Sequence, residues 1–222
     1  MEGNPLAPDI IFHIGVVPIS RAVATTWAIM AGLTILFWIG LRNPNKTNPL
    51  QTSAEILVEA LEDQIRQIAH RDPAHYLPLL GSLFIFLAVA NLSAVLPGVK
   101  PPTGHLETPA ALALVVFFSV HVFGLQAQGL GAYLRRYLKP NILMTPLNIL
   151  SELTRTLSLM VRLFGNMMSH EIMIAIISYL AGLLLPVPFL LLGVLIGLIQ
   201  AYIFTVLATV YIGAATGGIE AG

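Results

Sequence analysis

Five long apolar runs, separated by polar segments, set the pattern of this 222-residue chain. A membrane-spanning helix needs about 20 apolar residues to cross roughly 30 Å of hydrocarbon, and residues 22–41 contain no charged side chain. The pattern therefore predicts an all-α polytopic membrane protein with about five membrane helices in one domain, residues 1–222. The expected spans lie at residues 17–41, 77–97, 109–128, 147–181 and 186–216.

The segment between the first two spans has an amphipathic pattern. Over residues 53–69, apolar side chains recur three or four positions apart with polar ones between them. Thr52 followed by Glu55 has the spacing of a capping box. Because the segment is too polar to cross a bilayer, we expect a helix lying on the membrane surface. The alternative is a solvent-exposed helix packed on its neighbours.

The last two apolar runs are longer than a bilayer requires. Residues 147–181 would form a helix about 52 Å long at 1.5 Å per residue, and residues 187–215 one of about 43 Å. The hydrocarbon core is roughly 30 Å thick. We therefore expect two long, strongly tilted helices packed as a hairpin that can lie across another membrane body. The alternative is that residues 147–156 project into water.

Composition narrows the possible functions. The chain is 56% hydrophobic and 10% charged, with a mean hydropathy of +0.83, whereas soluble proteins carry about 25% charged residues. Its net charge of zero indicates no nucleic-acid partner. A chain without cysteine has no thiolate metal site, and we expect neither a metal nor another cofactor. The N-terminus lacks a basic region and a cleavage site, so we expect no cleaved signal peptide.

Basic residues predict how the chain is oriented in the membrane. The loops at 42–75 and 129–145 carry most of the lysines and arginines outside the spans, whereas the 98–108 loop carries only Lys100. The positive-inside rule places the first two loops in the cytoplasm. The N-terminus is then outside and, after five crossings, the C-terminus is cytoplasmic. Arg21 beside the first span argues mildly for the reverse.

The fourth span contains polar residues in the stretch "LSLMVRLFGNMMSHE", residues 157–171. Ser158, Arg162, Asn166 and Ser169 are spaced so that they share one face of a helix. An arginine at the bilayer centre costs about 2.5–3.5 kcal/mol on insertion scales and stays charged at any accessible pH. Such a charge needs a partner or a function.

No carboxylate of the same helix lies on the face of Arg162. Glu152 is ten residues away and about 80° round the helix, and Glu171 points to the opposite side. We therefore expect the partner carboxylate on another subunit. The alternatives are that the guanidinium reaches a lipid headgroup or forms a structural hydrogen bond with Gln200.

The last span offers a second polar face. Gly193, Gln200 and Tyr211 share it. Gly193 and Gly197 form a small-xxx-small pair, which permits close backbone approach. One arm of the expected hairpin thus presents arginine and asparagine, and the other presents glutamine and tyrosine.

The stretch around Arg162 closely resembles the signature of subunit a of the rotary F-type ATP synthases. The resemblance extends over nearly the whole chain from about residue 15, and its departures from the usual pattern suggest a divergent bacterial branch. Further matching stretches are "YLPLLGSLFIFLAVANLSAVLPG", "PPTGHLETPAALAL", "GLGAYLRRYLKP" and "LIQAYIFTVLATVYIGAA".

This resemblance implies an ion-channel stator. In the family, the arginine faces a ring of c subunits, and ions load and unload the ring carboxylates through two half-channels. The ion flow turns the ring and drives ATP synthesis, and ATP hydrolysis reverses it. The implied partners are the c-ring, b-type peripheral-stalk subunits, the lipid bilayer, and protons or, alternatively, sodium ions. The implied location is the bacterial inner membrane, and the chain itself is not expected to catalyse ATP chemistry.

The resemblance also implies roles for individual residues. Arg162 matches the essential arginine. His170 and Gly193 stand where many relatives have a small residue and a histidine, which suggests an exchange of positions; the alternative is that His170 only packs there. Asn148 stands where relatives often have glutamate, for which Glu152 can substitute. The polar residues matched to the half-channels are Asn148, Glu152, Asn166, His170, Glu171, Gln200 and Tyr211.

Three rival functions fit the sequence less well. A metalloprotease would need H-E-x-x-H, but the residue four positions after His170 is Ile174. A secondary transporter is disfavoured by five spans without an inverted repeat. A non-conducting scaffold of the same assembly would not need Arg162.

Overall fold

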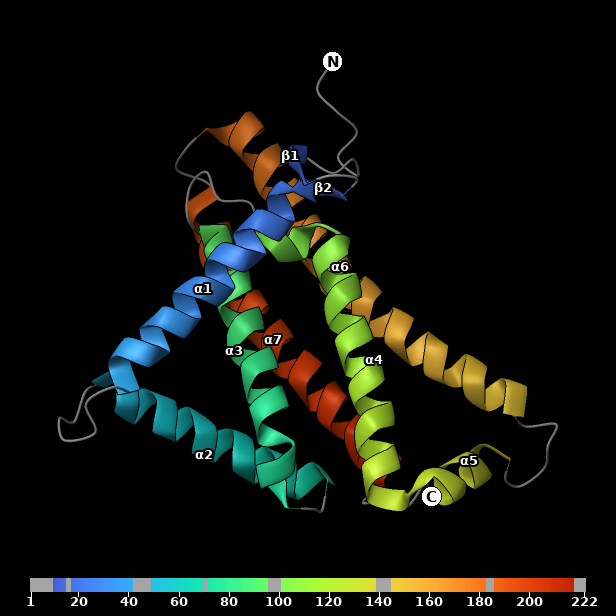
Figure 1. The fold of residues 1–222 in the computed structure, drawn as a ribbon. Helices are drawn as coiled ribbons and strands as arrows, with labels where there is room; N and C mark the ends of the chain where they lie inside the picture. Colours follow the sequence, from blue (N-terminus) through green and yellow to red (C-terminus); the bar gives the residue numbers. More distant parts are fainter. Residues whose placement is uncertain are drawn as a thin grey trace.

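A computed structural model of the chain shows a mainly helical fold (Figure 1). It describes residues 10–14, 17–41, 49–69, 72–95, 101–138, 145–182 and 186–217. Five of its helices are long and apolar enough to cross a membrane, which confirms the expected all-α polytopic fold. They are α1 (Arg21–Leu41), α3 (Leu77–Leu92), α4 (Glu107–Gln128), α6 (Thr145–Ala181) and α7 (Pro186–Thr216).

A short antiparallel hairpin precedes the first membrane helix. Strand β1 (Ile10–Ile14) pairs with β2 (Val17–Ser20), so the expected helical start at residue 17 is wrong and α1 begins at Arg21. Pro18 disfavours helical geometry at the residue before it. The Ser20 hydroxyl accepts a hydrogen bond from the Val23 amide at 3.4 Å, which is the contact of a helix N-cap.

The segment after the first span forms the amphipathic helix α2 (Pro49–Ala69). It begins earlier than expected, with Pro49 at a position that suits a first helical residue, so Thr52 lies inside the helix and is not its cap. Leu61, Ile65 and Ala69 form its buried side. The helix packs against α7, α3 and α1, and the Tyr202 hydroxyl donates to Gln64 Oε1 at 2.8 Å.

Helix α7 lies at the centre of the fold. It contacts α2, α3, α4 and α6, and Figure 1 shows it behind α3 and α4. The small residues Ala201, Ala208 and Ala215 are fully buried on it beside Phe204, which lets the neighbouring helices come close. In contrast, α1 buries little of its surface within the chain.

The last two helices form the long hairpin that their apolar runs predict. Helix α6 has 37 residues and α7 has 31, or about 55 Å and 46 Å at 1.5 Å per residue. Helix α7 crosses α3 and α4 obliquely, and α6 crosses α4 (Figure 1). Helix α6 is followed by Gly182 at φ 73°, a conformation that suits glycine after a helix C-terminus.

The connecting elements separate to two ends of the molecule (Figure 1). The β-hairpin, the short 3-10 turn η3 (Pro102–Gly104) and the C-terminal end of α6 lie at one end. The C-terminal end of α7 and the short helix α5 (Leu130–Leu138) lie at the other. Of the basic residues that predict orientation, Arg42, Lys46, Arg71, Lys100 and Lys139 lie outside the described residues.

Candidate functional site

Arg162 projects from the outer side of α6. Its neighbours Leu159 and Leu163 are buried against the fold, whereas Arg162 is exposed and Val161 is 57% exposed. Within the described residues, the guanidinium forms no ion pair or hydrogen bond with another side chain.

An apolar surface surrounds this arginine. The exposed side chains on α6 and α7 are mostly large and aliphatic, and such a surface on a membrane helix faces either lipid or another membrane protein. A fixed charge in the middle of it is costly against lipid alone. The aliphatic residues are Leu150, Leu153, Leu157, Val161, Ile172, Ile176, Leu191, Leu195, Leu198 and Ile199.

Asn166 and Gln200 connect the two arms of the hairpin one turn beyond Arg162. The Asn166 amide nitrogen donates to Gln200 Oε1 at 2.7 Å. Gln200 is 3% exposed, and its own amide nitrogen has no partner within the described residues. An unpaired buried donor costs about 1–3 kcal/mol, so this nitrogen can still donate to a water or to another polar group.

His170 is packed on Gly193 of the opposite arm. The imidazole is 8% exposed, and a Cβ added at Gly193 would overlap it. Only glycine at position 193 leaves room for the ring. His170 Nδ1 is buried without a hydrogen-bond partner in the described part of the chain. The two positions are thus spatially complementary across the hairpin.

Glu171 points toward the connection that contains η3. Its Oε2 would lie 3.0 Å from a Cβ at Gly104. Close by, Thr103 donates to Asn91 Oδ1 at 2.9 Å, and Asn91 donates to the Gly197 carbonyl at 2.8 Å. A buried polar chain therefore joins η3, α3 and α7 on the same side as Glu171 and His170.

A second group of polar residues lies toward the other end of α6. The Arg155 guanidinium is 5.7 Å from the centre of the Tyr211 ring. Both residues, with Ser151, Thr154, Ser158 and the two leucines Leu147 and Leu150, line a hollow of about 430 Å³.

Glu152 lies on a neighbouring face of α6, toward α4. Its Oε1 is 3.7 Å from Nε2 of His121. Asn148 is half-buried one turn earlier. The structure thus divides the expected polar residues into two groups, with Arg162 between them along the helix.

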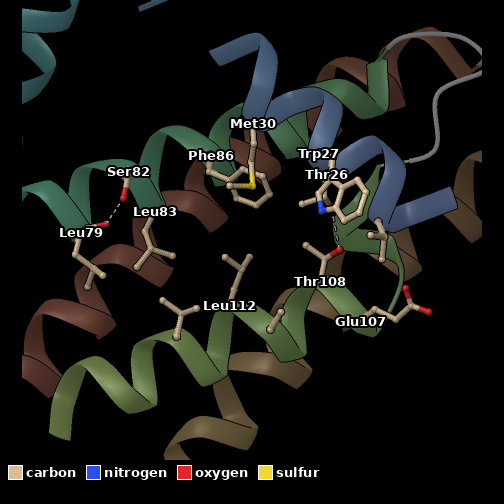
Figure 2. A pocket seen from close by; sticks show the side chains of 13 residues that line it. Thr26, Trp27, Met30, Leu79, Ser82, Leu83, Phe86, Glu107, Thr108 and Leu112 are labelled. Atoms are coloured by element: carbon tan, nitrogen blue, oxygen red, sulfur yellow. Dashed lines mark hydrogen bonds between the residues drawn. The ribbon is translucent and has the colours of Figure 1, made fainter. Parts of the chain in front are cut away.

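A separate, mostly apolar cavity is shown in Figure 2. It occupies about 450 Å³ between α1, α3 and α4, and no residue of α6 or α7 lines it. Figure 2 shows Met30, Leu83, Phe86 and Leu112 around it, with Glu107 at one end. Its apolar lining is unsuited to an ion.

Comparison with known proteins identifies the family. The family model described as "ATP synthase A chain" matches residues 23–213. A protein named ATP synthase subunit a 2 from Bradyrhizobium sp. is 53% identical over the full length of both chains. The chain belongs to the ATP synthase subunit a family. ATP synthase subunit a from Albidiferax ferrireducens is 45% identical, covering 96% of this chain and 94% of its own. Subunit a 1 from Prosthecochloris aestuarii is 46% identical, with 93% and 94% covered.

Membership in the subunit a family defines the general role. Proteins of this family form the stator part of the proton channel in F-type ATP synthase, and so take part in ATP synthesis and ion transport. They assemble with a c-ring and a peripheral stalk. Together with its five apolar helices, this makes the chain a multi-pass membrane subunit.

Sequence reasoning missed two polar connections in this subunit a fold. Asn91 and His121 were visible only as polar interruptions of apolar spans, and no spacing rule joins them to their partners. The Asn91 bridge needs three separate segments, and the His121–Glu152 contact needs the packing of α4 on α6. Within the described residues, no group of three His, Asp or Glu side chains could hold a metal ion.

Proposed function

We propose that Arg162 supplies the fixed positive charge at the meeting point of two half-channels in the stator. The observation that carries this proposal is its position: an unpaired guanidinium at the middle of α6, on an exposed apolar surface suited to a ring of membrane helices. The unpaired charge leaves the guanidinium available to a carboxylate that arrives on another subunit.

The outward half-channel would run along the polar residues on the η3 side of Arg162. Asn166, Gln200, His170 and Glu171 follow one another along the hairpin in that direction. Gln200 and His170 each keep a buried nitrogen without a partner in the described residues. Buried groups that can still form hydrogen bonds suit a route for protons, because each can bind a passing water.

The inward half-channel would begin at the hollow beside Tyr211. Its lining combines the polar residues Ser151, Thr154, Arg155, Ser158 and Tyr211 with Leu147 and Leu150, and Ser158 is about one helical turn before Arg162. Asn148 and Glu152 lie on the same part of α6, near its beginning. The two half-channels would thus reach Arg162 from opposite ends of the long helix.

The mechanism follows from the cost of a charge in lipid. A ring carboxylate facing lipid must be neutral, because a buried unpaired charge is expensive. Opposite Arg162 it can ionise, because a nearby positive charge lowers a carboxyl pKa. The ion released there leaves by the inward half-channel, and a new one enters by the outward half-channel. The permanent charge of Arg162 repels a cation that would pass directly between them.

We propose protons as the transported ion, with sodium as the alternative. The inferred path contains His170 and Glu171, which can take up and release protons. The test is ATP hydrolysis by the purified complex at varied sodium concentration. Hydrolysis independent of sodium supports protons, whereas activation by sodium would favour the alternative.

We further propose the orientation and location that the basic loops indicate. The side bearing α5 would face the cytoplasm of a bacterial inner membrane, with the N-terminus outside and the C-terminus inside. A single cysteine introduced into α5, for example at Arg135, is the probe, because the chain has no natural cysteine. It should be labelled by an impermeant thiol reagent only in inverted vesicles.

The direct test of the functional proposal is replacement of Arg162. We expect Arg162→Ala to abolish proton-driven ATP synthesis while the complex still assembles, because the ring carboxylate loses its counter-charge. Arg21→Ala is the matched control, since Arg21 lies at the start of α1, away from the hairpin. Retained synthesis in an assembled Arg162→Ala complex would favour a non-conducting scaffold.

A further inference from the structure

His121 and Glu152 form an ionisable contact between two membrane helices. The Nε2 and Oε1 atoms are 3.7 Å apart, and the side chains are 31% and 19% exposed. His121 lies seven residues before the end of α4, and Glu152 seven residues after the start of α6, so both are about 10 Å inside the helix ends. Arg162 is about 15 Å further along α6.

The backbone determines which nitrogen of His121 carries the permanent proton. Nδ1 is 2.8 Å from the carbonyl oxygen of Phe117. A carbonyl oxygen can only accept, so Nδ1 must donate. The tautomer of a histidine is set by the hydrogen bond of its other nitrogen. In a neutral His121, the lone pair of Nε2 therefore faces the carboxylate of Glu152.

Two lone pairs facing each other are unfavourable unless a proton lies between them. Either Nε2 is protonated and pairs with an ionised Glu152, or Glu152 carries the proton and can donate to Nε2. From these observations we propose that His121 and Glu152 share one proton and form a proton-exchange site of the inward half-channel. This inference rests on the proposed function of the chain.

The surrounding charges favour such a site at this depth. The Arg155 guanidinium lies over the Tyr211 ring in the hollow beside α6, seven residues before Arg162, and a positive charge there opposes a proton crossing alone. Glu152 is three residues from Arg155, so the two are neighbours on the helix surface, and its carboxylate offsets that repulsion. On the other side, the Tyr133 ring of α5 is 6.1 Å from His121. The side chains of residues 136–138 lie outside the described part of α5.

The exchange is a simple proton balance. A proton released from the ring carboxylate binds an oxygen of Glu152, and the proton on Nε2 of His121 passes to water on the α5 side. The new proton then moves from Glu152 to Nε2: the O–H bond breaks as the N–H bond forms. The bond from Nδ1 to Phe117 stays intact throughout, so the ring keeps its orientation.

The test uses the complete ATP synthase complex in lipid vesicles and measures ATP-driven proton pumping. We compare His121→Gln, Glu152→Gln and the double variant, with rates normalised to assembled complex. Each single variant should lower the rate at least about tenfold, since positioned acid–base groups contribute about 10²–10⁴-fold to proton transfer. The double variant should be no slower, because both single changes remove the same shared proton.

The matched control is His75→Gln. His75 is near the same end of the molecule and has an aromatic neighbour, but its Nε2 contacts the Gln126 amide oxygen at 3.3 Å instead of a carboxylate. We expect this variant to pump at the wild-type rate with the wild-type pH profile. His121→Gln and Glu152→Gln should both change that profile, and in the same way.

A spectroscopic measurement adds a result that loss of packing would not produce. With ¹⁵N-labelled histidine, the signal absent from His121→Gln should show a proton shared with Glu152 at Nε2 in the wild type. It should become that of a neutral ring protonated at Nδ1 in Glu152→Gln. If His121→Gln does not assemble, the pumping test relies on Glu152→Gln, because the glutamine side chain has nearly the same shape as glutamate.

The outcomes separate this inference from the proposed function. If Arg162→Ala abolishes pumping but His121→Gln and Glu152→Gln pump as fast as His75→Gln, the exchange site is wrong and the stator proposal stands. Additive losses in the double variant, or a His121 signal unaffected by Glu152→Gln, would also overturn the shared proton. If Arg162→Ala itself pumps normally, the proposed function fails.

Discussion

At the residue scale, close packing between the two arms of the α6–α7 hairpin fixes the positions of its polar side chains. His170 fills the space that Gly193 leaves, and Asn166 meets Gln200 across the same interface. Protein interiors are close-packed, so an added methyl group is felt directly. A residue's size on one arm therefore controls whether a polar group on the other arm keeps its position.

The fit of His170 to Gly193 separates packing from proton transfer. Gly193→Ala should displace the imidazole and destabilise the subunit by about 1–3 kcal/mol, the usual cost of overpacking. Adding His170→Ala should relieve the overlap and restore the amount of assembled complex. If His170 relays protons, the double variant assembles but pumps poorly. Pumping at the wild-type rate would show that His170 only packs.

At the element scale, the rotational setting of α6 decides which residue faces which neighbour. His170 and Glu171 are adjacent in sequence, yet one points at Gly193 of α7 and the other at Gly104 in η3. Successive residues of a helix differ by about 100° in direction. A rotation of α6 by one residue would turn Glu171 toward Gly193 and move His170 away from it.

Cysteine pairs test this setting, and the chain offers a clean background because it has no natural cysteine. We expect a short thiol-specific cross-linker to join His170→Cys/Gly193→Cys and Glu171→Cys/Gly104→Cys, because the native contacts are made by the far ends of the His170 and Glu171 side chains and a direct disulfide is too short to span them. The crossed pairs, 170 with 104 and 171 with 193, should not be joined, because the side chains point apart. Efficient bridging of a crossed pair would contradict the described rotation of α6.

The helices also show which features of the fold could be predicted from the sequence and which could not. Apolar length predicted the five spans and the oversized last two helices, because crossing a bilayer imposes a length on any sequence. The start of α1 was wrong because Pro18 and Ser20 act locally and the apolar run continues through them. The His121–Glu152 contact and the Asn91 bridge depend on which helices pack together, and hydrophobic periodicity does not contain that information.

At the scale of the whole molecule, one part of the α6–α7 hairpin is enclosed by other helices and another part is exposed. Helix α7 is enclosed by four other helices, whereas the outer surface of the hairpin around Arg162 is apolar and exposed. This is the surface that we propose for the c-ring. A ring that rotates against this surface must make weak contacts that can form and break at every position. Aliphatic side chains provide such contacts, because dispersion forces are not directional.

A bulky residue on that surface should therefore obstruct rotation. Val161→Trp, next to Arg162, should slow both ATP synthesis and ATP-driven pumping in an assembled complex. Val89→Trp on α3 is the control: it makes the same change at an exposed valine outside the hairpin and should have little effect. Equal slowing by both variants, or none by Val161→Trp, would argue against this contact surface.

The central claim is that Arg162 both attracts the ring carboxylate and prevents protons from crossing directly. The most direct measurement is proton flux through the vesicle-reconstituted complex of Arg162→Gln, first with ATP and then with an imposed membrane potential alone. The account predicts that ATP-driven pumping is lost and that passive proton flux rises above that of the wild type. A variant that still pumps and remains as proton-tight as the wild type would contradict it.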